Sequence, residues 1–162
     1  ILRLLARTLA DTGTLQEPPR IDHDTTVKFG AGEAGVPTLA EGWYPPEKWG
    51  IWLRGFAGRL HFTLRPPASA GAIRLQFRAV IHLDRAGTQA VRVFVNGREV
   101  ALWWFENPGA VEKIIELGAW AYAANKVEVA FFVAQPTSPA DRGAKDNRIF
   151  GFGLTALTVH PL

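Results

Sequence analysis

Hydrophobic and polar residues alternate with a period of two along much of the chain after residue 49. The clearest run is 72–83, where apolar residues recur at every second position and most residues between them are polar or charged. This spacing predicts a strand that buries one face and leaves the other in water. Other runs predict further strands over 26–29, 51–54, 60–64, 90–95, 99–105, 111–117, 126–134 and 149–160.

Turn signals separate these predicted strands. Asn96-Gly97 stands between two of them and supplies the positive φ values that a tight type I′ hairpin needs. The sequence predicts a short helical or turn segment over 119–124 and a polar loop over 135–148. Many short strands with almost no helix predict an all-β fold, an antiparallel β-sandwich of jelly-roll-like type.

The beginning of the chain has a different pattern. Residues 1–10 predict a short amphipathic helix, which Gly13 would end. We therefore divide the chain into an N-terminal helix or linker over 1–25 and a β-sandwich domain over 26–162. Methionine is absent, also at position 1, which favours an excised domain or a processed product. Apolar runs fall short of the about 20 residues of a spanning helix, so direct membrane insertion is not expected.

The amino-acid composition excludes some kinds of chemistry and argues against some classes of binding partner. With 162 residues, 48% of them hydrophobic, the chain fits one globular domain. Cysteine is absent, which excludes disulfides, thiolate metal sites and thiol nucleophiles. The net charge is only +3, and the basic residues are scattered. Nucleic acids and membrane surfaces attract concentrated basic patches, so neither is an expected partner.

Catalytic and cofactor motifs are missing from the sequence. The four histidines lack the spacing of a metal site, and no Gly-x-Ser-x-Gly elbow or phosphate-binding loop occurs. We expect a non-catalytic domain, with a small polysaccharide-active enzyme as the least favoured alternative. No cofactor is predicted. Aspartate oxygens leave a structural calcium ion open, although no loop has EF-hand spacing: Asp22, Asp24, Asp141 and Asp146.

Half of the six tryptophans fall within 42–55, among prolines, glycines and charged residues. Such rigid indoles suit either a surface for a flat polar ligand, such as a sugar ring, or an aromatic plug that closes one end of the sandwich. The alternation assigns Trp49 to the buried face, and Trp52 to the other face together with Arg54. Trp43 lies in a loop before a double proline, which would hold its indole rigidly.

Two further features accompany this motif. Trp103 and Trp104 are adjacent in a predicted strand, so one should point into the core and the other to the surface. Asp146 and Arg148 stand just before the last predicted strand. They suit either a turn in which the carboxylate pairs with the guanidinium, or hydrogen bonds to sugar hydroxyls. We expect this pair to meet the tryptophan motif from the other end of the chain.

Three motifs occur together in this chain. They are Gly42-Trp43-x-x-Pro46-Glu47-x-Trp49-Gly50-x-Trp52-x-x-Gly55, Val93-x-Val95-Asn96-Gly97-x-x-Val100 and Asp146-x-Arg148-x-x-Gly151-x-Gly153-Leu154. This combination resembles a β-sandwich domain attached to bacterial membrane glycosyltransferases and other exopolysaccharide-assembly proteins, and the resemblance spans residues 27–160. It implies a non-catalytic, carbohydrate-binding-like accessory domain of a polysaccharide-synthesis or glycosyltransfer protein. It also implies a glycan partner, a membrane glycosyltransferase in cis, and a periplasmic or extracytoplasmic place within a membrane-anchored protein.

The residues and the resemblance together give a set of candidate ligand-binding side chains. These are Trp43, Glu47, Trp52, Arg54, Trp103, Asp146 and Arg148. The alternative function is a structural or protein-docking β-sandwich that packs on a synthase partner. Glycan stacking requires an exposed indole near the polar candidates, whereas docking requires a contiguous apolar patch on the surface.

Overall fold

The computed structural model describes residues 17–67, 71–83 and 87–162, so the helix expected over 1–10 lies outside the described residues. The described residues form nine strands and three short 3₁₀ helices. The strands are β1 (Thr26–Lys28), β2 (Ile51–Trp52), β3 (Ala57–Thr63), β4 (Ile73–Ile81), β5 (Gln89–Val95), β6 (Arg98–Phe105), β7 (Gly109–Leu117), β8 (Lys126–Val133) and β9 (Phe152–Pro161). The 3₁₀ helices are η1 (Val36–Thr38), η2 (Ala119–Ala121) and η3 (Pro139–Arg142).

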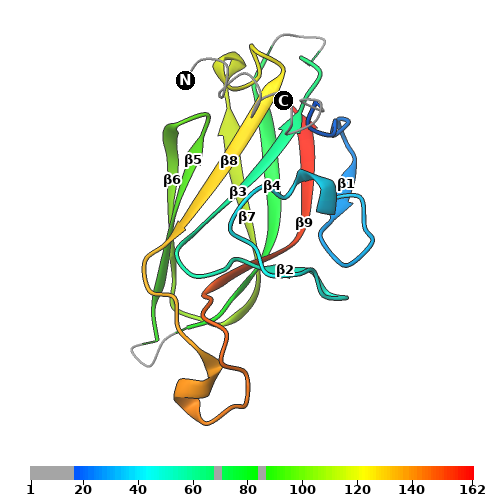
Figure 1. The fold of residues 1–162 in the computed structure, drawn as a ribbon. Helices are drawn as coiled ribbons and strands as arrows, with labels where there is room; N and C mark the ends of the chain where they lie inside the picture. The colour runs from blue at the N-terminus through cyan, green and yellow to red at the C-terminus, as the bar shows by residue number, and fades with distance from the viewer. Residues whose placement is uncertain (1–16, 68–70, 84–86) are drawn as a thin grey trace, which may run out of the picture.

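The strands pair into two antiparallel sheets that pack as a sandwich (Figure 1). The larger sheet has the order β1-β9-β4-β7, and β2 also pairs with β9. The smaller sheet has the order β3-β8-β5-β6. From β2 onward the chain changes sheet at every connection except the β5–β6 hairpin. This arrangement confirms the predicted all-β antiparallel sandwich, and its strand order is that of a jelly roll.

The core fills the space between the sheets, and β4 shows how the sequence builds it. Ile73, Leu75, Phe77, Ala79 and Ile81 are buried, whereas the residues between them are half-buried or exposed. Because successive side chains of a strand point to opposite faces, the period of two places these five apolar residues against the other sheet.

The β5–β6 hairpin matches its turn signal. Asn96 and Gly97 have φ values of +47° and +83°, positive at both central positions as a type I′ turn requires. The side-chain amide of Asn96 donates to the carbonyl of Lys126, and its oxygen accepts the backbone N–H of Glu128. These bonds tie the hairpin to β8.

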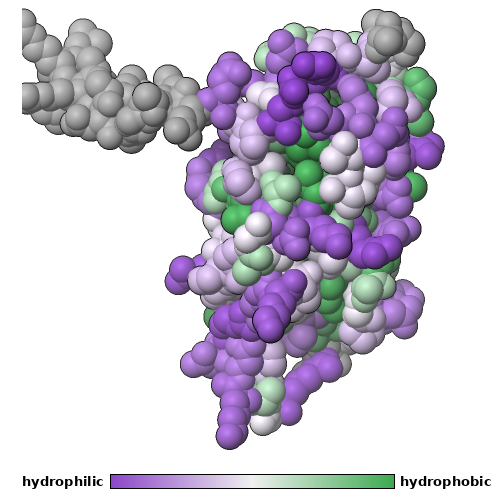
Figure 2. Space-filling model, turned by 90° about the vertical axis from the view of Figure 1, so that its right-hand side faces the viewer, coloured by the Kyte–Doolittle hydropathy of each residue, from purple (hydrophilic) through white to green (hydrophobic). Residues whose placement is uncertain are grey.

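Strand β9 brings distant segments of the chain together. One of its edges pairs with β4, and its other edge pairs with β1 and β2. The tryptophan motif around β2 therefore lies beside the loop that precedes β9. The side of the sandwich at the β1 edge has a mostly hydrophilic surface, with hydrophobic side chains visible in hollows between the polar ones (Figure 2).

Candidate functional site

Glu47, Asp146 and Arg148 meet in one ionic cluster. Arg148 Nη2 donates to Asp146 Oδ2 at 2.7 Å, and Arg148 Nη1 donates to Glu47 Oε2 at 3.1 Å. The backbone N–H of Arg148 also donates to Asp146 Oδ1, at 3.0 Å. The expected meeting of the two motifs is therefore present. Of the two arrangements that the sequence suggested for Asp146 and Arg148, the structure has the turn in which the carboxylate pairs with the guanidinium.

These contacts shift the ionisation of the cluster. Hydrogen bonds from the side chain and backbone of Arg148 hold the pKa of the Asp146 carboxyl below its ordinary value. The pKa of the Arg148 guanidinium is raised, mainly by its hydrogen bond to Asp146 and to a smaller extent by its hydrogen bond to Glu47. Because one guanidinium serves both carboxylates, much of its hydrogen-bonding capacity is used within the protein.

Two guanidinium groups lie near the ring of Tyr44. Arg54 is 5.6 Å from the centroid of its ring, and Arg148 is 5.5 Å from it. The Tyr44 hydroxyl accepts the backbone N–H of Ile149 at 3.0 Å and donates to the carbonyl of the same residue at 3.2 Å. Arg54 is exposed, yet its position over Tyr44 makes it part of the same packing. Tyr44 thus fixes the tryptophan motif to the segment before β9.

The indole of Trp52 packs within the protein. It stacks on Phe150 with ring centroids 4.1 Å apart, and Trp49 meets it edge-on at 4.9 Å. Trp49 is half-buried beside Trp52 and is not part of the core, in contrast to its expected place on the buried face. The N–H of Glu47 donates to the carbonyl of Gly50. This bond closes a turn over 47–50 that contains Trp49, whereas β2 begins only at Ile51. Trp49 therefore lies outside the alternation of the strand.

The other two candidate tryptophans face inward. The indole N–H of Trp43 donates to the carbonyl of Arg59 at 2.9 Å, and its ring meets Phe131 edge-on. Trp103, expected among the ligand-binding residues, is only 6% exposed and belongs to the core cluster. A buried indole offers no face to a ligand, so the structure corrects this expectation. The exposed member of the pair is Trp104, at 58%.

His82 packs beside Phe150, whose ring stacks on Trp52, and is half-buried. Its ring meets Phe150 edge-on at 5.0 Å, and its Nδ1 is buried with no hydrogen-bond partner in the described part of the chain. Burial lowers the pKa of His82, the charge of Arg142 lowers it further, and the charge of Asp146 raises it. A neutral imidazole in this position serves packing.

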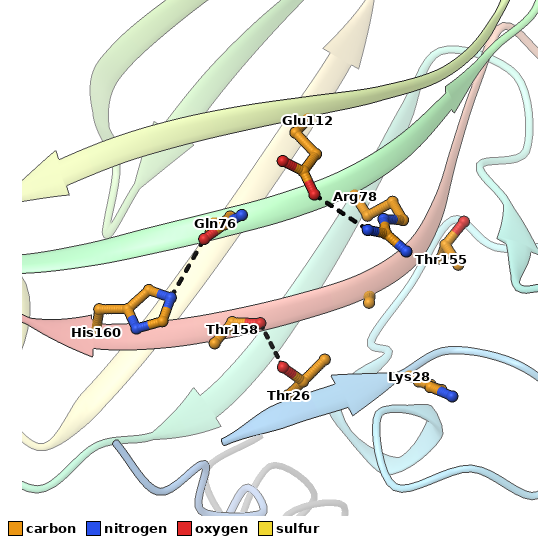
Figure 3. Close-up of a pocket in the computed structure, with 9 residues that line it drawn as sticks. Thr26, Lys28, Gln76, Arg78, Glu112, Thr155, Thr158 and His160 are labelled. Atoms are coloured by element: carbon orange, nitrogen blue, oxygen red, sulfur yellow. Dashed lines mark hydrogen bonds and ion pairs between the residues drawn. The ribbon is translucent and has the colours of Figure 1, made fainter. Parts of the chain in front are cut away.

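A separate groove lies on the outer face of the larger sheet (Figure 3). Its volume is about 430 Å³. The polar side chains that line it come from β1, β4, β7 and β9, and include Thr26, Gln76, Arg78, Glu112, Thr158 and His160. No candidate from the sequence lies in this groove.

Three hydrogen-bonded pairs organise the groove. Gln76 Oε1 lies 3.2 Å from His160 Nε2, Arg78 donates to Glu112 at 3.2 Å, and the hydroxyls of Thr26 and Thr158 are 2.7 Å apart (Figure 3). Guanidinium, amide and hydroxyl groups each have more donor or acceptor positions than these pairs use. The groove therefore presents both donors and acceptors to a ligand.

The alternation of 72–83 predicts from the sequence alone that Gln76 and Arg78 lie on the outer face of the sheet. The groove also requires β9 and β7 on either side of β4, with β1 beyond β9. A period of two does not encode the order of strands in a sheet. Sequence reasoning therefore missed the groove as a whole.

Three large apolar side chains are exposed on the outer face of the smaller sheet. Leu102, Trp104 and Phe132 are 63%, 58% and 45% exposed. Leu102 and Phe132 both pair with Arg92, from opposite sides, so they share one face. Arg92 lies between them and breaks the apolar area, so the face offers a docking function separate apolar side chains rather than one contiguous patch.

The suggested calcium ligands do not form a donor set. Within the described residues, no group of three or more histidine, aspartate or glutamate residues is placed to hold a metal. Asp22, Asp24 and Asp146 each pair with a different basic side chain. In the part of the chain that the structure describes, no helix has the length and hydrophobicity to cross a bilayer.

No family model and no curated protein matches the chain. Among solved structures, it is similar to the CBM36-1 domain of a multidomain xylanase from the hindgut metagenome of Trinervitermes trinervoides, with 14% identity, a TM-score of 0.47, and coverage of 85% of this chain and 97% of that one. It is also similar to a carbohydrate-binding module, CBM36, in complex with calcium and xylotriose, with 14% identity, a TM-score of 0.46, and coverage of 83% and 98%. The mosquito-larvicidal Cry4Aa toxin from Bacillus thuringiensis matches with 8% identity, a TM-score of 0.48, and coverage of 90% and 25%. At these values the matches assign neither a family nor a ligand to this chain.

Proposed function

We propose that this chain is a non-catalytic carbohydrate-binding domain and that the groove on the larger sheet holds the saccharide. The observation that supports this most directly is the groove itself, an open hollow of about 430 Å³ lined by hydroxyl, amide, imidazole, carboxylate and guanidinium groups. A saccharide carries many hydroxyls, each of which both donates and accepts, so it is best held by such a mixed set.

The groove also has the rigidity that a binding site needs. Its side chains project from four neighbouring strands of one sheet, and pairs such as Thr26 with Thr158 fix their orientation. A net contribution of about 1 kcal/mol per hydrogen bond gives a weak single site, with a Kd on the order of 0.1 to 1 mM. Weak binding suits a domain that holds a polymer near a tethered enzyme, where a high effective concentration compensates for low affinity.

The cellular context is a finer part of the proposal. The motifs within 42–55 and 146–154 support a bacterial polysaccharide-synthesis or glycosyltransfer protein, with the domain periplasmic or extracytoplasmic and a membrane glycosyltransferase in cis. We assign the cluster of Glu47, Asp146 and Arg148 to closing the fold, because its charges pair with one another.

Affinity electrophoresis tests the proposal. The purified domain is run in gels that contain xylan, mannan, β-1,3-glucan or alginate. We expect at least one polymer to retard the wild type, and we expect the double variant Gln76→Ala/Thr158→Val to lose most of that retardation because it removes an amide and a hydroxyl from the groove. His61→Ala, on the outer face of the smaller sheet, is the control and should behave as wild type. Circular dichroism checks that each variant is folded.

Protein docking is the second candidate, because Leu102 and Phe132 expose apolar side chains on one sheet face. Docking on a synthase partner predicts that none of the four polymers retards the domain. Retardation of the wild type that is largely lost in the groove variant would exclude docking as the sole function.

A further inference from the structure

We propose a second carbohydrate-binding site, in which one pyranose ring stacks on the indole of Trp104 in a cleft where β6 turns into β7. This site lies outside the groove. The cleft has a volume of about 230 Å³ and is lined by Trp104, Glu106, Asn107, Pro108 and Lys113, among others.

The indole of Trp104 is presented on a regular strand. It is 58% exposed, while the side chains of its neighbours Trp103 and Phe105 are buried. Its partner across the sheet is Ala90, whose methyl group is too small to cover the ring. A large planar ring on a rigid strand binds with little loss of conformational entropy, and its apolar face complements the C–H face of a pyranose.

Polar groups surround this ring, as a sugar site requires. Glu106 Oε1 accepts the indole N–H of Trp104 at 3.4 Å. Lys113 Nζ lies 5.1 Å from the centroid of the Phe105 ring, at the side of the same cleft, and Asn107 adds an amide. A stacked pyranose carries its hydroxyls around its rim, where a carboxylate, an ammonium group and an amide would meet them. These groups favour a saccharide over a protein surface at this position.

Trp120 shows why exposure of an indole is not enough. It is 38% exposed, but the guanidinium of Arg98 lies 4.4 Å from the centroid of its ring. That cation occupies a face on which a sugar would stack. Trp120 is therefore the matched control for Trp104.

The two sites adjoin across β7. Glu112 lines the groove, whereas Val111 and Lys113 line the cleft, because alternate residues of a strand point to opposite sides. A polymer that occupies both sites binds more tightly than one that occupies either, since the second contact is intramolecular. We expect Trp104→Ala to weaken retardation by the polymer at least fivefold, and Trp120→Ala to leave it unchanged.

Indole N–H signals in ¹H–¹⁵N NMR spectra test the stacking directly. Xylotetraose, cellotetraose and mannotetraose are added in turn to the ¹⁵N-labelled domain, and the Trp104 signal is identified by its loss in Trp104→Phe. We expect at least one tetrasaccharide to shift this signal while the Trp120 signal stays in place. The shift should persist in Gln76→Ala/Thr158→Val, since the groove is a separate site.

Three other outcomes would each contradict the second site, and the last of them would also contradict the proposed function. Shifts of groove amides without a shift at Trp104 would remove the second site and leave the proposed function standing. Equal shifts at Trp104 and Trp120 would show non-specific contact and remove the second site. A domain whose spectrum responds to none of the three sugars, and which no polymer retards, would remove both.

Discussion

Arg148 Nη1 lies 3.1 Å from Glu47 Oε2, and the two residues are 101 positions apart in the chain. This ion pair joins the loop before β9 to the tryptophan motif. The two side chains are 31% and 39% exposed, so solvent screens their attraction. Arg148 also bonds to Asp146. Replacing Arg148 therefore leaves the carboxylates of Glu47 and Asp146 without the guanidinium that they share.

Arg148→Gln should lower the free energy of unfolding by about 1 to 2 kcal/mol, because it removes charge-assisted hydrogen bonds that are partly screened by water. Glu47→Gln should cost less, since it removes only one of these bonds. Urea denaturation of both single variants and the double variant measures the coupling, which we expect to be about 0.5 kcal/mol. Full additivity would show that the pair contributes nothing to stability.

Acid should weaken the fold through Asp146. Hydrogen bonds from Arg148 hold the pKa of this carboxyl below its usual 3.8. Because its folded pKa is depressed, the stabilisation is complete above the unfolded pKa and is lost as the pH falls through the folded one. The difference in unfolding free energy between wild type and Asp146→Asn should thus be constant near neutral pH and shrink below about pH 4. Urea denaturation at several pH values measures it, and a difference that persists to the lowest pH would contradict the shift.

The adjacent tryptophans of β6 should respond very differently to truncation. Trp103→Ala should cost about 3 to 5 kcal/mol of unfolding free energy, because it leaves a cavity in the core. Trp104→Ala should cost less than about 1 kcal/mol, because its indole is exposed. Thermal and urea denaturation of the two variants provide the comparison. Similar losses would show that the faces of β6 are wrongly assigned.

Two glycines with positive φ provide a matched pair of substitutions. Gly42 and Gly55 have φ values of +93° and +68°, so alanine at either is strained by about 1 to 2 kcal/mol. A Cβ at Gly42 would also collide with the carbonyl of Ala57, whereas one at Gly55 meets nothing within 4 Å. Gly42→Ala should therefore destabilise the domain by at least about 1 kcal/mol more than Gly55→Ala in urea denaturation. Equal effects would mean that the close approach at Gly42 is relieved at no cost.

Local patterns in the sequence predicted the elements of this fold well. The alternation of 72–83 predicted the buried face of β4, and Asn96-Gly97 predicted the β5–β6 turn. Both depend on residues close together in the chain, which is where period and turn chemistry carry information. The sequence also led us to expect the meeting of Arg148 with Glu47, through two motifs that occur together.

Two errors have physical causes that lie outside such patterns. Trp49 was assigned to the buried face by extending the period of two through a turn, which the bond from Glu47 to Gly50 interrupts. For Trp103 and Trp104, alternation predicts opposite faces but not which of them is inner. That choice depends on the neighbouring strand and sheet, and so does the groove around Gln76.

Backbone amide mapping is the most direct test of the groove. The ¹⁵N-labelled domain is titrated with the same three tetrasaccharides, and the shift of every assigned amide is recorded. Our account predicts that the largest shifts from at least one sugar include Thr26, Gln76 and Thr158, and that these shifts disappear in Gln76→Ala/Thr158→Val. Binding that leaves the amides of the larger sheet unmoved, or the absence of any shift with all three sugars, would contradict it.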